Sequence, residues 1–180
     1  AGLGAPVEGG LGQGGSAGLL PLQGIGEGAA QRIAIRTPRA KRAETAQADD
    51  PGLRAALQGW PMGELPPARM QGGRSWWVVQ VADEAALRAL QPDWDAVAAL
   101  AEFTDSMGVF AYAFSDGSEG FDLAVRAFVG NGRRLEDSDS GAANAVLAAW
   151  LDLRCVLPLG REPYVVSPGR AVGHDARPTL

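Results

Sequence analysis

Three carboxylates, Glu136, Asp137 and Asp139, stand directly before a stretch whose composition predicts a buried helix. Residues 142–153 are apolar apart from one asparagine and one aspartate, and a helix that is apolar on every side is typically buried rather than amphipathic. Such a helix carries its own N-terminus into the protein, together with the side chains beside it. The sequence therefore predicts acidic groups at the interior end of a buried helix.

The start of this helix has two interpretations. The N–H groups of a first helical turn have no partner inside the helix, and with the helix dipole they form a site suited to an anion such as a carboxylate. Gly141 and Ala142 leave those groups unobstructed, and an acid beside the site could move a proton on the bound molecule. Alternatively, Ser138, Asp139 or Ser140 caps the helix, and the acids only stabilise its positive end by about 0.3–1 kcal/mol each.

The elements that must position these groups follow from periodicity and from start and stop signals. Strands are expected where apolar residues alternate or run together, and helices where Asp or Pro precedes an apolar repeat. A hairpin turn is expected at DGSEG, between two of the strands, and GWPMGELPPARMQGG is expected to be a turn-rich connector. The expected strands are RIAIRTPRA, RSWWVVQVA, GVFAYAFS, FDLAVRAFV and PYVVS, and the expected helices follow Asp50, Asp83, Asp93 and Ser140.

Composition excludes several classes of protein. The chain has 180 residues, of which 46% are hydrophobic and 21% charged, and its net charge of −5 offers no basic surface for nucleic acid. No stretch approaches the roughly 20 apolar residues of a membrane span, and no basic-then-apolar segment that would indicate a signal peptide opens the chain. A single Cys155 and a single His174 leave few ligands for zinc or iron. The default expectation is a metal-free cytoplasmic protein.

Several stretches together resemble one known family. AVRAFV followed by LEDSDSGAANAVLAAWL is similar to the signature of the phenazine-biosynthesis (PhzF-like) isomerases. That signature runs Arg-x-Phe, then Glu-Asp-x-x-Thr/Ser-Gly-Ala/Ser-Ala, then an apolar helix. The similarity covers essentially the whole chain, because three further stretches match in the same order: GGSAGLLPL with RIAIRTPRA, SWWVVQVADEAALRALQPDWDAVAAL, and YVVSPGRAVGHDAR.

The resemblance implies an α+β fold like that of diaminopimelate epimerase, with a mixed sheet wrapped around a central apolar helix. It also implies proton transfer next to a carboxylate, without a cofactor or a metal. Asp137 matches the family's second-half acid and is expected to be catalytic, whereas Glu136 is expected to be a structural partner of the turn before the helix and Asp139 to be solvated. The expected substrate-binding residues are Ser140, Gly141 and Ala142 at the helix start and Gly169 in the closing motif.

The chain also departs from the family's pattern. The family's first half contributes a strand-borne glutamate and a Gly-His-Pro segment, and residues 1–17 resemble neither. We therefore expect a remnant of the first domain over residues 1–59, with residues 1–17 as loop or disordered. A complete second domain is expected over residues 60–165, followed by a closing segment, residues 166–180, that returns toward the first domain. In that segment Ser167-Pro168-Gly169 and Gly173-His174 stand where the family has Ser-Gln-Gly and Gly-Arg, which removes an N–H, an amide side chain and a fixed cation.

Two functions are compatible with these patterns. The first is a PhzF-like isomerase or epimerase that moves a proton next to a carboxylate in a small-molecule substrate. The second is a truncated or degenerate relative without catalysis, acting as a binding or assembly module. The expected partners are a small carboxylated metabolite and a second copy of the chain, since apolar surface that the first domain normally covers would otherwise be exposed. Neither nucleic acid nor a membrane is expected as a partner.

Overall fold

The computed structural model describes residues 12–15, 18–25, 32–35, 41–42, 50–137, 140–156 and 165–168. Before residue 50, and at Pro168, that description is of the backbone alone. The chain divides into two compact units, Ala1–Pro38 and Arg39–Leu180. The expected membership of residues 1–59, 60–165 and 166–180 in a remnant, a complete domain and a closing segment stays a prediction.

The first unit contains a three-stranded antiparallel sheet. Its strands are β1 (Gly12–Gly15), β2 (Gly18–Ile25) and β3 (Arg32–Ile35), in the order β1-β2-β3. The strand expected in RIAIRTPRA is confirmed as β3, which pairs with β2 from Leu22 opposite Ile35 to Ile25 opposite Arg32. Strand β1 lies within residues 1–17, where a loop was expected. Ladder hydrogen bonds join backbone groups, so a glycine-rich segment can pair with a neighbour although its composition carries no strand signal.

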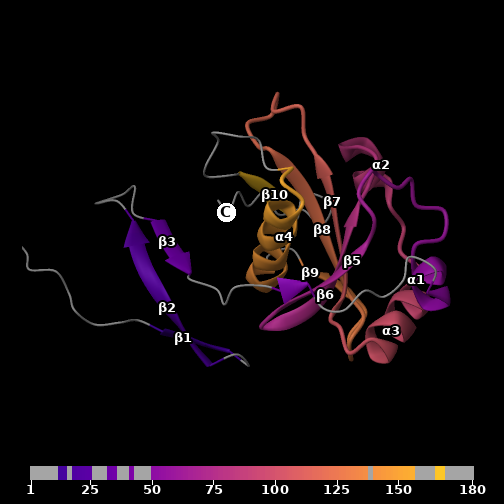
Figure 1. Ribbon diagram of the computed structural model, residues 1–180, viewed down its shortest axis with the longest axis horizontal. Coiled ribbons are helices and arrows are strands. Elements are labelled where there is room, and N and C mark those ends of the chain that lie inside the picture. The colour runs from indigo at the N-terminus through magenta and orange to yellow at the C-terminus, as the bar shows by residue number, and fades with distance from the viewer. Residues whose placement is uncertain are drawn as a thin grey trace, which may run out of the picture. The chain divides into compact units, whose positions relative to one another are not determined.

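The second unit is built on a mixed seven-stranded sheet (Figure 1). Strands β6–β7 and β10–β8 are parallel pairs and the remaining pairs are antiparallel, with the order β10-β8-β7-β6-β5-β4 and β9 also paired to β8. The strands are β4 (Lys41–Arg42), β5 (Ala68–Gly72), β6 (Arg74–Gln80), β7 (Gly108–Phe114), β8 (Leu123–Val129), β9 (Leu135–Asp137) and β10 (Val166–Pro168). The helices are α1 (Pro51–Ala56), α2 (Glu84–Ala89), α3 (Trp94–Phe103) and α4 (Gly141–Leu153).

The helix starts confirm the expected capping residues. The Asp50 carboxylate accepts hydrogen bonds from the backbone N–H groups of Gly52 and Leu53 at 2.7 and 3.1 Å. Asp83 and Asp93 cap α2 and α3 in the same way, on either side of the break at Pro92. These carboxylates satisfy N–H groups that have no partner within the helix, so the short helices begin where the sequence predicts.

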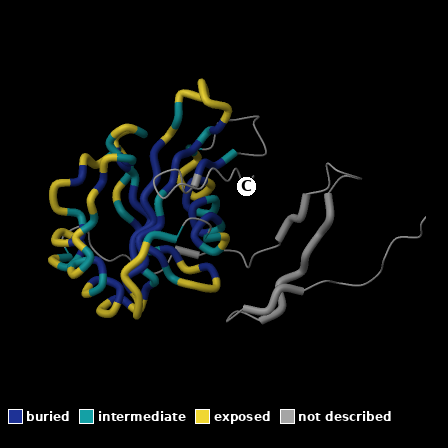
Figure 2. Tube along the Cα trace, turned by 180° about the vertical axis from the view of Figure 1, so that it is seen from behind, coloured by how far each residue is buried: buried dark blue, intermediate teal, exposed yellow. Residues whose placement is uncertain are grey.

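The two faces of the sheet carry two separate cores, because successive side chains of a strand point to opposite faces. Helices α1, α2 and α3 cover one face and α4 lies on the other (Figure 1). The neighbours Trp76 and Trp77 show the alternation: Trp77 packs beneath the three helices and Trp76 packs beneath α4, and both are buried. Figure 2 shows this continuous burial along the central strands, with the exposed residues concentrated in the connections.

Helix α4 is buried on one side rather than on every side, which corrects the expectation from its composition. Six of its residues are buried, among them Val146, Leu147 and Trp150, but Leu153 is 56% exposed and Ala149 is only half-buried. The sheet covers one side of the helix, and the alanines on the other side are small enough to tolerate partial exposure. In the part of the chain that the structure describes, no helix is long and apolar enough to cross a membrane.

Strand β5 was missed in the sequence because it lies within the turn-rich stretch expected to be a connector. Its alternate residues Ala68, Met70 and Gly72 are buried, but Gly72 has no side chain, so the sequence shows only two apolar side chains and the alternation is not distinctive. The strand forms a hairpin with β6 in which Gly72 lies opposite Arg74. Gly73 at the turn has a φ of +74°, a conformation that favours glycine.

The buried hydroxyl of Tyr112 gives a testable pH dependence. Burial raises the pKa of Tyr112 to about 12 against the opposing effects of nearby Trp150 and Arg154, and the hydroxyl makes no well-formed hydrogen bond within the described chain. Between pH 10 and 12 the unfolded chain loses this proton first, so the folded state should lose roughly 2–3 kcal/mol of stability as the pH rises.

Tyr112→Phe should remove that loss and change the free energy of unfolding at pH 7 by less than about 1 kcal/mol, because the hydroxyl makes no well-formed hydrogen bond within the described chain. Urea unfolding followed by far-ultraviolet circular dichroism at pH 7, 10 and 11 measures both effects. A variant that remains as alkali-sensitive as the original chain would contradict the assignment.

Candidate active site at the start of helix α4

The register of β9 separates the two adjacent acids. In the antiparallel pair of β8 and β9, Ala127 lies opposite Asp137 and Phe128 lies opposite Glu136. Directly opposed residues project from the same face of a sheet. Phe128 belongs to the core beneath α1–α3 and Ala127 to the core beneath α4, so Asp137 is on the face of α4 and Glu136 is on the opposite face.

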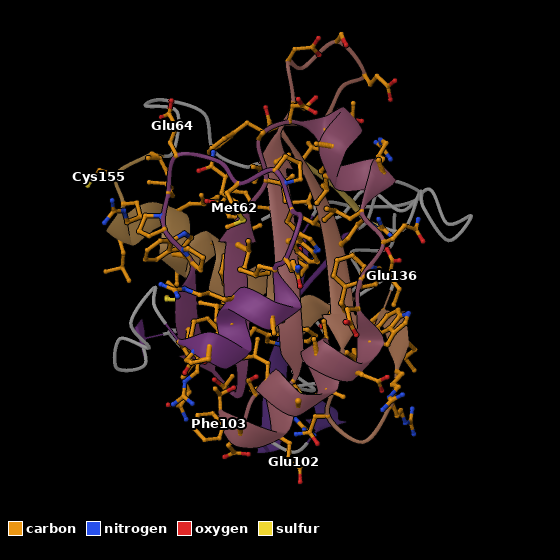
Figure 3. All side chains as sticks on the ribbon, turned by 90° about the vertical axis from the view of Figure 1, so that its right-hand side faces the viewer. Met62, Glu64, Glu102, Phe103, Glu136 and Cys155 are labelled. Carbon is orange, nitrogen blue, oxygen red and sulfur yellow. The ribbon has the colours of Figure 1, made fainter. Side chains whose placement is uncertain are left out.

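Glu136 is held by a two-point ion pair with Arg126 of β8 (Leu123–Val129). Arg126 Nε donates to Glu136 Oε1 at 2.9 Å, and Nη2 donates to Oε2 at 2.7 Å. The two side chains are only 10% and 9% exposed. A parallel pair of charged hydrogen bonds is among the stronger polar contacts in proteins, so Arg126 of β8 is a structural partner of Glu136. The expected contact of Glu136 with the turn before α4 involves residues 138–139, which lie outside the described residues. Figure 3 shows Glu136 on the opposite side of the view from Cys155, which follows the far end of α4.

The remaining terminal nitrogen of Arg126 binds the end of helix α2 (Glu84–Ala89). Arg126 Nη1 donates to the carbonyl oxygens of Leu87, Arg88 and Leu90 at 3.1, 3.3 and 2.8 Å. The last carbonyls of a helix have no intrahelical partner and carry its negative dipole end, so a cation is favoured there. The guanidinium also lies 4.8 Å from the ring centroid of Phe128. We call Arg126, Glu136 and these three carbonyls the Arg126 clamp.

Ser140 caps α4, as one of the two interpretations of the sequence proposed. Its hydroxyl accepts a hydrogen bond from the N–H of Ala143 at 3.4 Å, a long cap contact. Gly141 is exposed, and a Cβ placed on it would meet no other atom within 4 Å. Ala142 is half-buried. The first turn of α4 is therefore unobstructed at Gly141, the geometry that an anion would need to approach its N–H groups.

One polar residue at this helix start was not selected from the sequence. Asn144 is 4% exposed, and its Oδ1 atom is buried without a hydrogen-bond partner among the described residues. Side chains of a helix lean toward its N-terminus, which places this amide over the turn that begins at Ser140. The signal in the sequence was its isolation as the single polar residue in the first three turns of an apolar helix.

The structure describes part of the set of expected site residues. Asp137, Ser140, Gly141 and Ala142 lie within one short segment, on or beside the start of α4. Gly169 lies outside the described residues, as do Ser138, Asp139 and His174. Arg133 and Arg134 precede β9 and are exposed, and Arg134 pairs with the exposed Asp95 at 2.5 Å. Among the described residues, no group of three His, Cys, Asp or Glu side chains is arranged to hold a metal ion.

The arrangement of the mixed sheet around α4 is the diaminopimelate-epimerase-like α+β fold. The family model of the phenazine biosynthesis-like (PhzC-PhzF) proteins matches residues 8–177, and the chain belongs to this family. Among curated proteins no match is found.

Solved structures of similar fold come from several bacteria. A PhzF-family phenazine biosynthesis protein of Bacillus anthracis is 19% identical with a TM-score of 0.67, and the match covers 91% of this chain and 56% of that one. A protein of Pseudomonas aeruginosa described as a predicted epimerase is 19% identical with a TM-score of 0.63, and the match covers 88% of this chain and 54% of that one. A PhzF-family protein of Enterococcus faecalis is 21% identical with a TM-score of 0.51, and the match covers 90% of this chain and 54% of that one. The chain thus spans little more than half the length of these proteins.

The length of the Ser140 cap bond predicts a small contribution to stability. Ser140→Ala should lower the free energy of unfolding by about 0.5–1 kcal/mol, whereas Asp50→Ala, which removes two shorter bonds at α1, should cost about 1–2 kcal/mol. Urea unfolding of both variants at pH 7 makes the comparison. A larger cost for Ser140→Ala than for Asp50→Ala would show that the Ser140 hydroxyl has a stabilising contact beyond the cap.

Proposed function

We propose that the protein is a PhzF-like isomerase or epimerase that moves a proton next to a carboxylate in a small biosynthetic metabolite, without a cofactor. Asp137 transfers the proton and the start of α4 binds the carboxylate. The observation that carries the proposal is the register of β9. Asp137 projects on the face of α4, whereas Glu136 projects on the other face and is bound by Arg126. Membership in the family supports the same class of reaction.

Carboxylate binding rests on the first turn of α4. The N–H groups of Gly141 and Ala142 are among those that have no partner within a helix, and the open space around Gly141 allows an oxygen to approach them. Ser140 supports this site from the side through its cap contact, and Gly169 of the closing motif is proposed to add a further contact. The helix dipole adds a favourable interaction with the bound anion.

Proton transfer rests on the position of Asp137. An aspartate beside the bound carboxylate can remove the proton of the adjacent carbon, or can return one after protonation. Isomerisation and epimerisation need both operations, and a second acid facing the substrate from the opposite side would divide them between two groups. The resemblance to the family assigns that second acid to the family's first half, and the match to the Bacillus anthracis protein covers 56% of that protein's length.

Exchange of substrate hydrogen for deuterium tests the reaction without knowledge of the product. The chain would be incubated in D₂O with a panel of α-amino, α-hydroxy and β,γ-unsaturated carboxylic acids, and deuterium uptake would be followed by mass spectrometry. Asp137→Asn should lower the rate of deuterium uptake by at least about 100-fold, while the circular dichroism spectrum stays unchanged. Asp152→Asn is the matched control, because Asp152 is an exposed aspartate at the other end of the same helix. Equal uptake by Asp137→Asn and the unaltered chain would end the assignment.

Partial coverage of the family's length favours one alternative function. A chain that matches 54–56% of its solved relatives can keep the carboxylate site and lack the second acid. Such a protein would bind carboxylates as a binding or assembly module. The alternative predicts saturable binding of panel acids, seen as shifts of the Gly141 and Ala142 amide signals by NMR, with no deuterium uptake by the unaltered chain.

We also propose a homodimer in the cytoplasm. Leu153 at the end of α4 is 56% exposed and Phe103 at the end of α3 is 81% exposed, and exposed apolar side chains of this size are often covered by a partner. Light scattering coupled to size-exclusion chromatography should give about twice the 18.7 kDa mass of the chain. A monodisperse monomer across micromolar concentrations would contradict the dimer.

A further inference from the structure

Arg126 lies between the two short strands that pair with the outer edge of β8. Strand β8 has two neighbours along its outer edge: β10 pairs with residues 123–125, and β9 pairs with residues 127–129. Arg126 is the residue between these two ladders. Neither β9 nor β10 pairs with Arg126, and its side chain instead binds Glu136 of β9 and the end of α2.

Strand β9 has a short ladder, so the connection through Arg126 matters for its position. It is three residues long and pairs only with β8 among the described strands. So short a ladder fixes its register weakly, and a slip of one residue would move every side chain to the opposite face. The two-point bond from Arg126 to Glu136 ties the middle residue of β9 to β8, while the bonds to Leu87, Arg88 and Leu90 tie the same guanidinium to α2.

The geometry points to Arg126 and Glu136 as positioning residues for the proposed proton transfer. By fixing Glu136 on the face of α1–α3, the clamp fixes Asp137 on the face of α4. A displacement of about 1 Å in a group that must meet a reacting atom can cost about 100-fold in rate. This inference rests on the proposed function, because it concerns the same acid, and it adds a mechanism that holds that acid in place.

Lysine cannot replace the arginine in this role. The guanidinium directs five N–H bonds in a fixed plane, which allows it to bind both oxygens of Glu136 and the three carbonyls at once. An ammonium group is a single point with three donors, and it cannot reach a carboxylate on one side and a helix end on the other with the same geometry. Arg126→Lys therefore keeps the charge and removes the connection.

Two matched variants separate a positioning role from a general loss of stability. Arg126→Lys and Glu136→Gln alter the clamp from its two sides, so that the test survives if one of them fails to fold. Arg134→Lys is the control, because it makes the same chemical change two residues before Glu136, in a pair with Asp95 whose side chains are 57% and 81% exposed. Hydrogen exchange of the backbone amides of residues 135–137 reports on the β8–β9 ladder without any substrate.

If the clamp positions Asp137, Arg126→Lys and Glu136→Gln should accelerate amide exchange at residues 135–137 by about 10-fold or more, against less than about 2-fold for Arg134→Lys. With an active panel acid, kcat for deuterium uptake should fall by about 10- to 100-fold while KM changes little, because Ser140 and α4 still bind the carboxylate. Unchanged exchange at residues 135–137 in both clamp variants would overturn the inference, as would a loss of kcat no larger than that of Arg134→Lys.

The outcomes distinguish this inference from the function on which it rests. If Asp137→Asn leaves deuterium uptake unaltered, the proposed function is wrong, whatever the clamp variants do. If Asp137→Asn abolishes uptake and the clamp variants retain full kcat, the function stands and the positioning role is wrong. If the chain takes up no deuterium at all, the amide exchange of residues 135–137 still decides whether the clamp holds β9 in register.

Discussion

The alternation of side chains along β8 is the constraint on which the rest of the second unit depends. Ala124 and Phe128 pack under α1–α3, whereas Leu123, Val125, Ala127 and Val129 pack under α4. Because β9 pairs with β8, the same alternation holds along β9, and Glu136 and Asp137 project from opposite faces of the sheet. One geometric rule thus builds both hydrophobic cores and assigns different environments to two adjacent carboxylates.

Three ion pairs of arginine with a carboxylate in the described part of the chain differ in what they can contribute. Arg88–Glu84 within α2 and Arg134–Asp95 are partly or largely exposed, and such pairs contribute at most about 1 kcal/mol because water already solvates both charges. The Arg126 and Glu136 side chains are only 10% and 9% exposed, and Arg126 has additional hydrogen-bond partners that compensate for desolvation. A buried pair of this kind is weak support for overall stability but a strong constraint on geometry, because removing either partner leaves a buried charge alone.

The family model and the similar solved structures establish the family and the fold, and the second unit contains the candidate site. In the second unit, α4 presents an unobstructed first turn and β9 presents an acid on the same face. Beside that turn the Oδ1 atom of Asn144 is buried without a hydrogen-bond partner among the described residues, which adds to the candidate site a polar group that the family signature did not suggest. Deuterium uptake depends on Asp137, whereas carboxylate binding depends on the start of α4. The two measurements therefore separate an enzyme from a binding module.

The sequence by itself determined the features that consecutive residues encode. Asp50, Asp83 and Asp93 predicted three helix starts, the DGSEG turn predicted the β7–β8 hairpin, and the apolar run after Ser140 predicted α4. The tertiary structure decided which side of α4 packs on the sheet, that ARMQG forms β5, and that LED forms β9. It also decided the partners of Arg126, which come from residues 10 to 39 positions away. Caps, turns and periodicity are local properties of the chain, but register and side-chain partners depend on which distant segments pack together, and no short stretch of sequence contains that information.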